Sequence, residues 1–185
     1  MICTIRQQRC VETKLFDFES GSALVPWPSV DDGVMGGLSK GRMIPTDQGH
    51  ACFTGLVRLD NNGGFCSIQS PQLTSSLHGY DGITLRVRGD GQAYSLGLHQ
   101  AHMFAGTSYR CRFDTIPLQW IDVVLPFQQF ILMRFGQRAG VSPVCPQKIV
   151  QLSLLCGDRQ AGPFTLELAA IGAWRAIEPG EENHA

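Results

Sequence analysis

Adjacent acidic residues at Asp31 and Asp32 are the clearest candidates for chemistry in this sequence. Neighbouring carboxylates can ligate a hard cation or serve as an acid–base pair. A calcium loop needs further side-chain oxygens at short spacing, but residues 33–37 (Gly-Val-Met-Gly-Gly) offer only backbone carbonyls. We therefore favour a turn in which an aspartate accepts hydrogen bonds from backbone amides, and we expect no metal ion.

A nucleophile motif of the form G-x-S-x-G spans residues 37–41, with Ser39 at its centre. In hydrolases this motif needs a strand before it and a helix after it, because that turn exposes the serine. Here a glycine precedes it and Pro45 follows closely, so the helix is missing. Neither a phosphate loop nor a dinucleotide-binding glycine motif is present. The sequence predicts no enzyme and no bound cofactor.

His99 and His102 are three residues apart and have no acidic neighbour. In a strand such residues point to opposite faces, so they would not share a metal there. A loop would permit it, but we favour ordinary solvated or core histidines.

Arg86 and Arg88 alternate with apolar residues, which places both arginines on one face of a predicted strand. If that face were the concave face of the fold, they could bind an anion or a sugar. Otherwise they are ordinary solvated residues, which is the more common outcome. Sugar-binding sheets also need exposed aromatic rings, and Trp120 is expected to face outward, although the neighbouring Gln119 leaves its orientation open.

Short alternating segments must position these residues. Period-two alternation of apolar residues predicts half-buried strands, and no stretch holds three clean helical turns. One helical turn is expected within residues 127–134. Nine or more strands are predicted, around residues 15–18, 51–59, 65–70, 83–87, 94–98, 109–113, 121–125, 150–156 and 164–168.

Asparagine, aspartate and glycine separate the predicted strands. Residues 61–64 (Asn-Asn-Gly-Gly) and 89–91 (Gly-Asp-Gly) tolerate positive φ and suit tight turns between consecutive strands. This pattern predicts an all-β fold, a jelly roll or β-sandwich. We expect a single domain at residues 12–176, with flexible tails at 1–11 and 177–185.

Charge and composition exclude several classes of function. Fifteen Lys and Arg stand against sixteen Asp and Glu, so there is no basic excess for a nucleic-acid partner. No apolar run approaches the ~18 residues of a membrane helix, and the first residues lack a signal peptide. We expect no membrane insertion and a cytoplasmic location.

The seven cysteines, an odd number without a Cys-x-x-Cys pair, predict reduced thiols.

An ordered series of blocks resembles the complex I intermediate-associated protein 30 family. The first is residues 27–39 (Trp-Pro-Ser-Val-Asp-Asp-Gly-Val-Met-Gly-Gly-Leu-Ser). Further blocks follow in the same order, at residues 53–55, 61–67, 80–83, 86–91, 125–127 and 162–168. The resemblance covers about residues 14–175 and implies a galactose-binding-domain-like β jelly roll, akin to carbohydrate-binding modules.

The resemblance also implies a function. It suggests a non-enzymatic, chaperone-like assembly factor whose partner is a membrane-complex subunit or an assembly intermediate, mitochondrial in a eukaryote. The alternative is a small-molecule or glycan ligand on the concave face. The glycine and aspartate motifs could form such a binding surface or serve only as turns. The candidate surface consists of Trp27, Asp31, Asp32, Met35, Asn61, Asn62, Phe65, Arg86, Arg88, Asp90 and Trp120.

Overall fold

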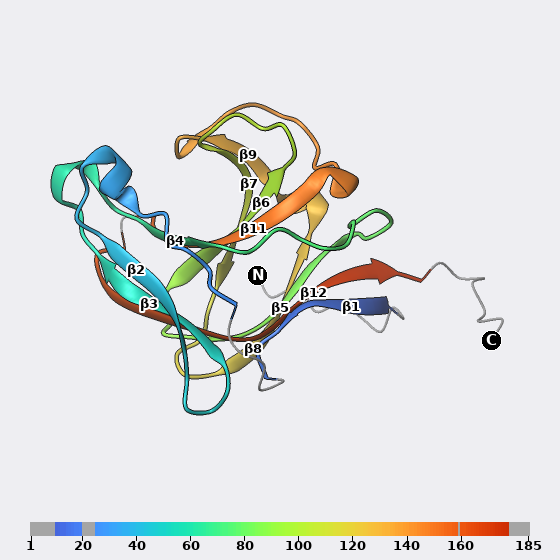
Figure 1. Cartoon of the computed structure of the whole chain (residues 1–185), viewed down its shortest axis with the longest axis horizontal. Helices are drawn as coiled ribbons and strands as arrows, with labels where there is room; N and C mark the ends of the chain where they lie inside the picture. The colour runs from blue at the N-terminus through green and yellow to red at the C-terminus, as the bar shows by residue number, and fades with distance from the viewer. Residues whose placement is uncertain (1–9, 20–24, 159, 178–185) are drawn as a thin grey trace.

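Two six-stranded antiparallel sheets form a sandwich in a computed structural model of the chain (Figure 1). The structure describes residues 10–19, 25–158 and 160–177. Sheet A contains β1 (Cys10–Asp17), β2 (Lys40–Pro45), β3 (Ala51–Val57), β5 (Gly82–Gly89), β8 (Trp120–Pro126) and β12 (Gly162–Ala176). Sheet B contains β4 (Cys66–Gln69), β6 (Ala93–Gln100), β7 (Thr107–Asp114), β9 (Ile131–Arg134), β10 (Gln137–Arg138) and β11 (Ile149–Cys156). Short 3-10 helices are η1 (Asp32–Met35), η2 (Asp60–Asn62), η3 (Phe127–Gln129) and η4 (Pro146–Lys148).

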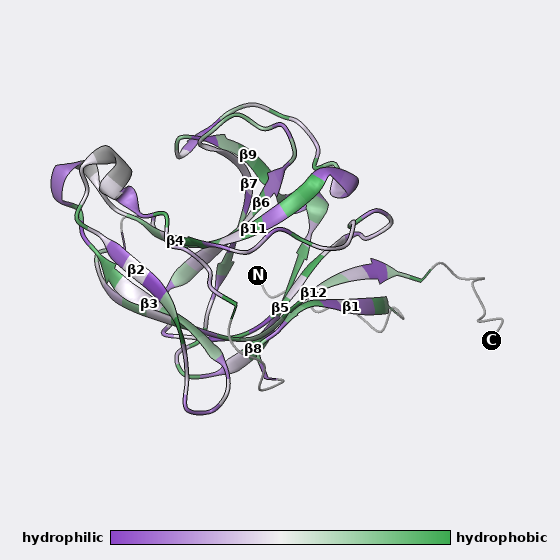
Figure 2. Cartoon of the chain, viewed as in Figure 1, coloured by the Kyte–Doolittle hydropathy of each residue, from purple (hydrophilic) through white to green (hydrophobic). Residues whose placement is uncertain are grey.

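Alternating apolar side chains from both sheets meet in one core. Along β6, the side chains of Tyr94, Leu96 and Leu98 belong to this core, whereas Ser95 and Gly97, which alternate with them, are buried but do not belong to it. The rings of Phe53 and Phe164 pack edge to face, with 4.7 Å between their centroids. Figure 2 shows hydrophobic and hydrophilic residues interspersed along the strands, as this arrangement requires. The predicted all-β sandwich is confirmed.

Consecutive strands often lie in different sheets. β3 leads into β4, and β5 leads into β6, and in both cases the chain crosses from sheet A to sheet B. Residues 61–64 and 89–91 join consecutive strands as predicted, but the strands that they join lie in different sheets and do not pair with each other. The backbone conformations are those expected of these residues, since Asn61 has φ 53° and Gly91 has φ 92°. The turns carry the chain around the edge of the sandwich, because packing between the sheets outweighs local pairing.

Three strands fall outside the predicted segments, namely β2, β9 and β10. β9 and β10 are too short to show alternation, and their neighbours in sheet B hold them. β1 begins at Cys10, within the segment expected to be a tail, because Cys10 pairs with Ala176 of β12. The helical turn expected within 127–134 is η3.

The six cysteines in the described residues are free thiols, and Cys52, Cys66, Cys111 and Cys156 are buried. Cys3 lies outside the described residues. Burial raises the pKa of the Cys66 and Cys156 thiols to about 12, so they are small apolar components of the core. Across the described ranges, no helix is long and apolar enough to cross a membrane.

Candidate functional site

Asp32 is fully buried and anchors separate chain segments at one corner of the sandwich. Its Oδ1 accepts a hydrogen bond from the Ser39 N–H at 3.0 Å. Its Oδ2 accepts hydrogen bonds from the Ser39 hydroxyl at 2.5 Å and from the N–H groups of Gly64 at 2.7 Å and Phe65 at 3.3 Å. The carboxylate is thus used entirely within the protein, in the structural role favoured from the sequence.

Asp31 makes a second connection from the adjacent position. Its Oδ2 accepts a hydrogen bond from the Gly41 N–H of β2 at 2.9 Å, and its Oδ1 accepts one from the Ser67 N–H of β4 at 3.1 Å. Because β2 belongs to sheet A and β4 to sheet B, this carboxylate joins the two sheets. The adjacent aspartates therefore hold the corner of the fold.

The two carboxyl groups differ in acidity. Burial raises the pKa of Asp31 and outweighs the hydrogen bonds from Gly41 and Ser67. Burial also acts to raise the pKa of Asp32, but the hydrogen bonds from Ser39 and the loop amides hold it below its ordinary value. Acids with opposite shifts can mark an active site. Here Asp32 has no exposed surface for a substrate to reach, and no cluster of three or more His, Cys, Asp or Glu able to hold a metal occurs among the described residues.

Close packing around Asp32 explains why positions 37 and 63 are glycines. A Cβ at Gly37 would lie 2.3 Å from the Asp32 Cγ, and one at Gly63 would lie 2.6 Å from its Oδ2. Ser39 is also buried, since its hydroxyl donates to Asp32 and accepts a hydrogen bond from the Arg58 N–H at 2.9 Å. This serine is therefore not displayed as a nucleophile.

Asn61 and Phe65 lie at the same corner. The Asn61 Nδ2 donates to the Gly36 carbonyl at 3.1 Å, and the Phe65 ring is half-buried. Met35 ends η1 and Asn62 ends η2. The side chains of Met35 and Asn62 lie outside what the structure describes.

Arg88 and Trp120 form a second group, on the outer face of sheet A. The Arg88 guanidinium makes a forked contact with Glu167, at 2.7 Å to Oε2 and 3.0 Å to Oε1, and lies 5.1 Å from the centre of the Trp120 ring. Arg86 pairs with Asp122 at 2.9 Å. Trp120 is half-buried rather than open, because the His50 ring packs against it with 4.7 Å between centroids. Both arginines are already paired with carboxylates, which leaves neither free for an anion.

The last two predicted site residues lie apart from both groups. Asp90 accepts hydrogen bonds from the Tyr94 hydroxyl at 3.0 Å and the Thr165 N–H at 2.8 Å. Trp27 is buried against Phe16, with 5.1 Å between ring centroids. The structure therefore distributes the eleven predicted residues over several places, and most of them hold the fold together.

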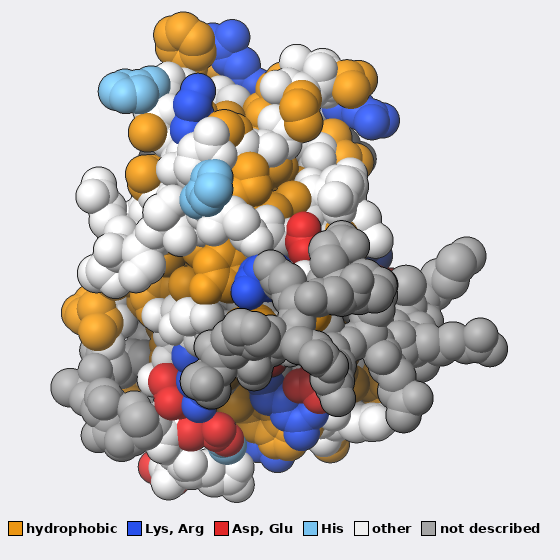
Figure 3. All heavy atoms as spheres, turned by 90° about the vertical axis from the view of Figure 1, so that its right-hand side faces the viewer, with side chains coloured by type: hydrophobic (Ala, Val, Ile, Leu, Met, Phe, Trp, Pro, Cys, Tyr) orange, Lys and Arg blue, Asp and Glu red, His pale blue; other side chains and the backbone are white. Residues whose placement is uncertain are grey.

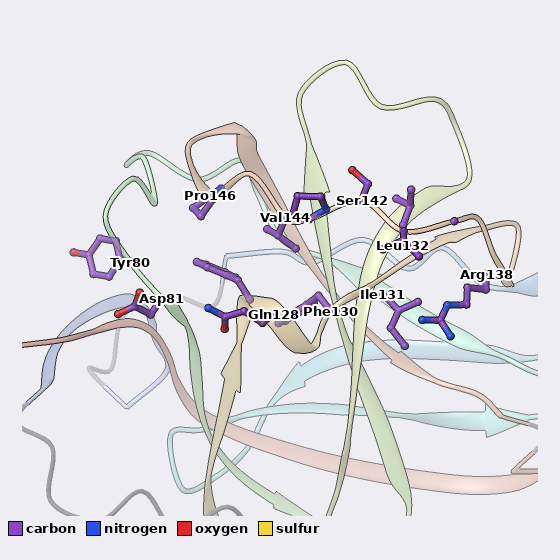
Figure 4. Close-up of a pocket in the computed structure, with 14 residues that line it drawn as sticks. Tyr80, Asp81, Gln128, Phe130, Ile131, Leu132, Arg138, Ser142, Val144 and Pro146 are labelled. Carbon is purple, nitrogen blue, oxygen red and sulfur yellow. The ribbon is translucent and has the colours of Figure 1, made fainter.

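A pocket of about 620 Å³ lies elsewhere, beneath the segment 140–146 (Figure 4). Figure 4 shows Tyr80 and Asp81 at one end of it and Arg138 at the other. Apolar side chains contribute most of its lining, namely Phe127, Phe130, Ile131, Leu132, Val141, Pro143, Val144 and Pro146. η3 and β9 position the floor, because the rings of Phe127 and Phe130 are anchored in the core.

Some polar side chains that line the pocket are hydrogen-bonded within the protein, and Arg138 differs from them. The Tyr80 hydroxyl donates to Thr13 Oγ1, and Asp81 Oδ2 accepts from the Ala176 N–H, each at 2.8 Å. Arg138 is exposed and forms no ion pair or hydrogen bond within the described residues. The pocket is thus an apolar groove, and at one end of it lies the Arg138 guanidinium, which has no partner among the residues that the structure describes.

Sequence reasoning missed this pocket, because its lining comes from segments that show no shared motif. A signal was nevertheless available. Residues 123–157 contain Arg134, Arg138 and Lys148 but no aspartate or glutamate. A long stretch that is apolar, cationic and free of acids indicates a surface different from the rest of this nearly neutral chain.

Comparison with known proteins places this fold in a family. The sequence pattern of complex I intermediate-associated protein 30 matches residues 16–168. The chain belongs to that family. Within the family, it is 24% identical over 181 residues to the mitochondrial complex I intermediate-associated protein 30 of Drosophila melanogaster, covering 85% of this chain and 61% of the fly protein. It is 28% identical over 100 residues to the mouse protein of that name, covering 51% of this chain and 30% of the mouse protein.

This family member therefore spans about three fifths of the fly relative and three tenths of the mouse relative in these alignments. Both Asp31 and Asp32 and the entire pocket fall inside the matched region.

Solved structures with a similar architecture include carbohydrate-binding modules. The family 11 module of a cellulosomal cellulase of Clostridium thermocellum has a TM-score of 0.65 at 14% identity, covering 95% of this chain and 98% of the module. The same kind of module in complex with a β-1,3-1,4-mixed-linked tetrasaccharide has a TM-score of 0.64 at 15% identity, covering 90% and 97%. A family 30 module has a TM-score of 0.57 at 13% identity, covering 90% and 99%. These likenesses show the fold alone and confirm the predicted jelly roll.

Proposed function

We propose that this protein is a non-catalytic binding protein that holds an apolar polypeptide segment while a respiratory or other multi-subunit complex is assembled. The observation that carries the proposal is the pocket beneath residues 140–146. Family membership supports an assembly role, since the named relatives are complex I intermediate-associated proteins.

The lining of the pocket suits an extended apolar segment. Phe127 and Phe130 supply a rigid aromatic floor, while Ile131 and Val141 at the mouth are exposed and would lose contact with water on binding. Within the described part of the chain, Arg138 pairs with no carboxylate. A partner segment with an acidic residue or a chain-terminal carboxylate beside its apolar part would therefore match the pocket.

Site-specific photo-crosslinking tests this proposal in the native host. A photoreactive amino acid replaces Val141 in one version of the chain and Leu118 in a control version. Both side chains are highly exposed, at 96% and 85%, but only Val141 lines the pocket. We expect one defined product from position 141, identified by mass spectrometry as a subunit or intermediate of a membrane complex, and none from position 118.

Two further variants sharpen the test. Ile131→Glu places a charge at the apolar mouth, and Arg138→Glu reverses the free cation. Both should remove the product at position 141 and lower the amount of assembled complex on native gels when they replace the wild-type chain. Identical products from positions 118 and 141, or a product unaffected by both variants, would overturn the proposal. Thermal melting of each purified variant verifies that it is folded.

Glycan binding is the second candidate, and the shared fold is what favours it. The sheet face that such a site would use is the outer face of sheet B. Its outward residues on β6, β7 and β11 are mainly small or polar. His99, Arg110 and Gln151 are half-buried there, and Ser95 and Ser153 are buried. Sugar-binding faces use aromatic rings as stacking platforms, and the outward positions of these three strands carry none. A glycan array probed with the purified chain would show this second function directly.

A further inference from the structure

Two phenylalanines project from neighbouring loops at one end of sheet B. Phe104, in the loop between β6 and β7, is 77% exposed, and Phe135, in the turn between β9 and β10, is 67% exposed. The loops touch, because the Phe135 N–H donates to the Gly106 carbonyl at 2.8 Å. Burying exposed rings of this size is worth a large free energy, so a pair of them on adjacent loop tips marks an interaction surface.

A cation joins the two rings. The Arg134 guanidinium lies 5.8 Å from the centre of the Phe104 ring and 5.7 Å from that of Phe135. Arg88 pairs with Glu167, but Arg134, like Arg138, forms no ion pair within the described residues. We call Phe104, Arg134 and Phe135 the aromatic tip.

The backbone holds Phe135 outward at a cost. Phe135 has φ 47° and Gly136 has φ 76°, so this two-residue turn places a bulky side chain in the left-handed region. Asn, Asp and Gly are the residues that this type of turn favours, and φ above zero is unusual for phenylalanine. A residue that is strained and also exposed contributes little to stability, and such strain is commonly kept for function.

The tip lies in a region without acidic side chains. No Asp or Glu occurs between Asp90 and Asp114 or between Asp122 and Asp158, the two stretches that supply both loops. The tip is at the end of the sandwich that carries β7 and β9, the upper end in Figures 1 and 3. On the face shown in Figure 3, the upper part displays hydrophobic, Lys/Arg and His side chains but no acidic ones. The end of the molecule is therefore apolar and cationic.

We propose that the aromatic tip docks this protein on the surface of an anionic lipid bilayer. Exposed phenylalanines enter the boundary between headgroups and acyl chains, and Arg134 between them contacts lipid phosphate. Loop tips suit a bilayer better than the contact surface of a folded protein, because they protrude and offer no pocket for a partner's side chains. Docking is peripheral and needs no spanning segment, and it uses none of the three residues tested in the pocket.

Vesicle co-sedimentation of the purified chain tests the proposal. One set of vesicles is phosphatidylcholine alone, and the other contains phosphatidylglycerol at 30 mol%, a composition chosen for the assay. We expect binding to the anionic vesicles that weakens as the salt concentration rises, and little binding to the neutral ones. Arg134→Gln should weaken binding about fivefold, the ratio that corresponds to ~1 kcal/mol for one basic residue near an anionic surface.

Matched variants of exposed apolar residues distinguish binding through the aromatic tip from non-specific hydrophobic binding to the vesicles. The double variant Phe104→Ala with Phe135→Ala should abolish sedimentation, whereas Leu118→Ala should not change it. Leu118 is 85% exposed but lies between β7 and β8, beyond the end of β7 that is remote from the aromatic tip, and its N–H donates to the Gly89 carbonyl at the end of β5. The proposal fails if wild-type protein stays in the supernatant with both vesicles, or if the double variant binds as the wild type does. Thermal melting confirms that every variant is folded, so that lost binding is not lost structure.

Discussion

The Ser39 hydroxyl donates a 2.5 Å hydrogen bond to the Asp32 carboxylate, and both side chains are buried. The same hydroxyl accepts a hydrogen bond from the Arg58 N–H, so the pair connects the segment before β2 to the end of β3. A serine and an aspartate in contact would suggest catalysis in an open cleft. Because both side chains are buried and hydrogen-bonded within the protein, they stabilise the fold.

Replacing Asp32 should be far more harmful than replacing Asp31. Asp32→Asn replaces one of the two accepting oxygens by an NH₂ group, which is itself a donor. Buried donors that bond to the carboxylate then lack an acceptor, so we expect a loss of ~3 kcal/mol in the free energy of unfolding. Asp31→Asn, at a half-buried position with two hydrogen bonds, should lose only ~1 kcal/mol. Urea denaturation of both variants measures the difference, and equal losses would contradict the assignment.

Acid should remove the stabilisation that Asp32 supplies. Its pKa is lowered on folding, so its contribution is complete above the ordinary carboxyl pKa and is lost as the pH falls through the folded-state value. The stability gap between wild type and Asp32→Asn should therefore narrow below about pH 4. For Asp31 the pKa is raised, so its contribution runs the other way and grows more favourable as the pH falls. Urea titrations from pH 3 to pH 7 check both signs.

Alanine substitutions at two nearby glycines should differ greatly in their effect on stability. Gly37→Ala would push a methyl group to 2.3 Å from the Asp32 Cγ, and we expect a loss of ~3 kcal/mol. Gly33→Ala meets nothing within 4 Å and should change stability by less than ~0.5 kcal/mol. Thermal melts of the two variants provide the comparison, and a tolerated Gly37→Ala would argue against the observed packing.

Double-mutant cycles should rank two arginine–carboxylate ion pairs of sheet A. The Arg88–Glu167 pair is forked, and its side chains are only 25% and 18% exposed, so we expect a coupling energy of ~1 kcal/mol. The Arg86–Asp122 pair is 44% and 74% exposed and should couple by ~0.3 kcal/mol because water screens it. Replacement of each partner by Gln or Asn, singly and together, gives both values. The reverse order would contradict this ranking.

Thiol reactivity should follow burial. The pKa of Cys66 and Cys156 is raised to about 12 because both are buried, whereas Cys10 is exposed. In a chain carrying Cys3→Ser, Cys10 should react rapidly with an aromatic disulfide reagent at pH 8, and the two buried thiols should react only after unfolding. Mass spectrometry locates the modified residues, and rapid labelling of Cys66 in the folded chain would contradict its burial.

Most of the architecture was predictable, because strand signals are local. Alternation of the type seen at Tyr94, Leu96 and Leu98 needs only neighbouring residues to be recognised, and it yielded the sandwich. The structural role of Asp31 and Asp32 also followed from the chemistry of a carboxylate in a glycine-rich turn. The hydrogen-bond partners of Asp32 could not be predicted in the same way. They extend to Phe65, which is far from Asp32 in the sequence.

The sequence by itself determined the strands, the turn residues and the nearly neutral charge, because each depends on residue type and spacing. Only the tertiary structure decided that residues 61–64 and 89–91 cross between sheets and that Arg88 meets Glu167 across strands, which removes it as a ligand for anions. It also assembled the pocket and the aromatic tip from segments with no common pattern. Those features depend on which distant surfaces pack together, and that is settled by the total burial of the two sheets.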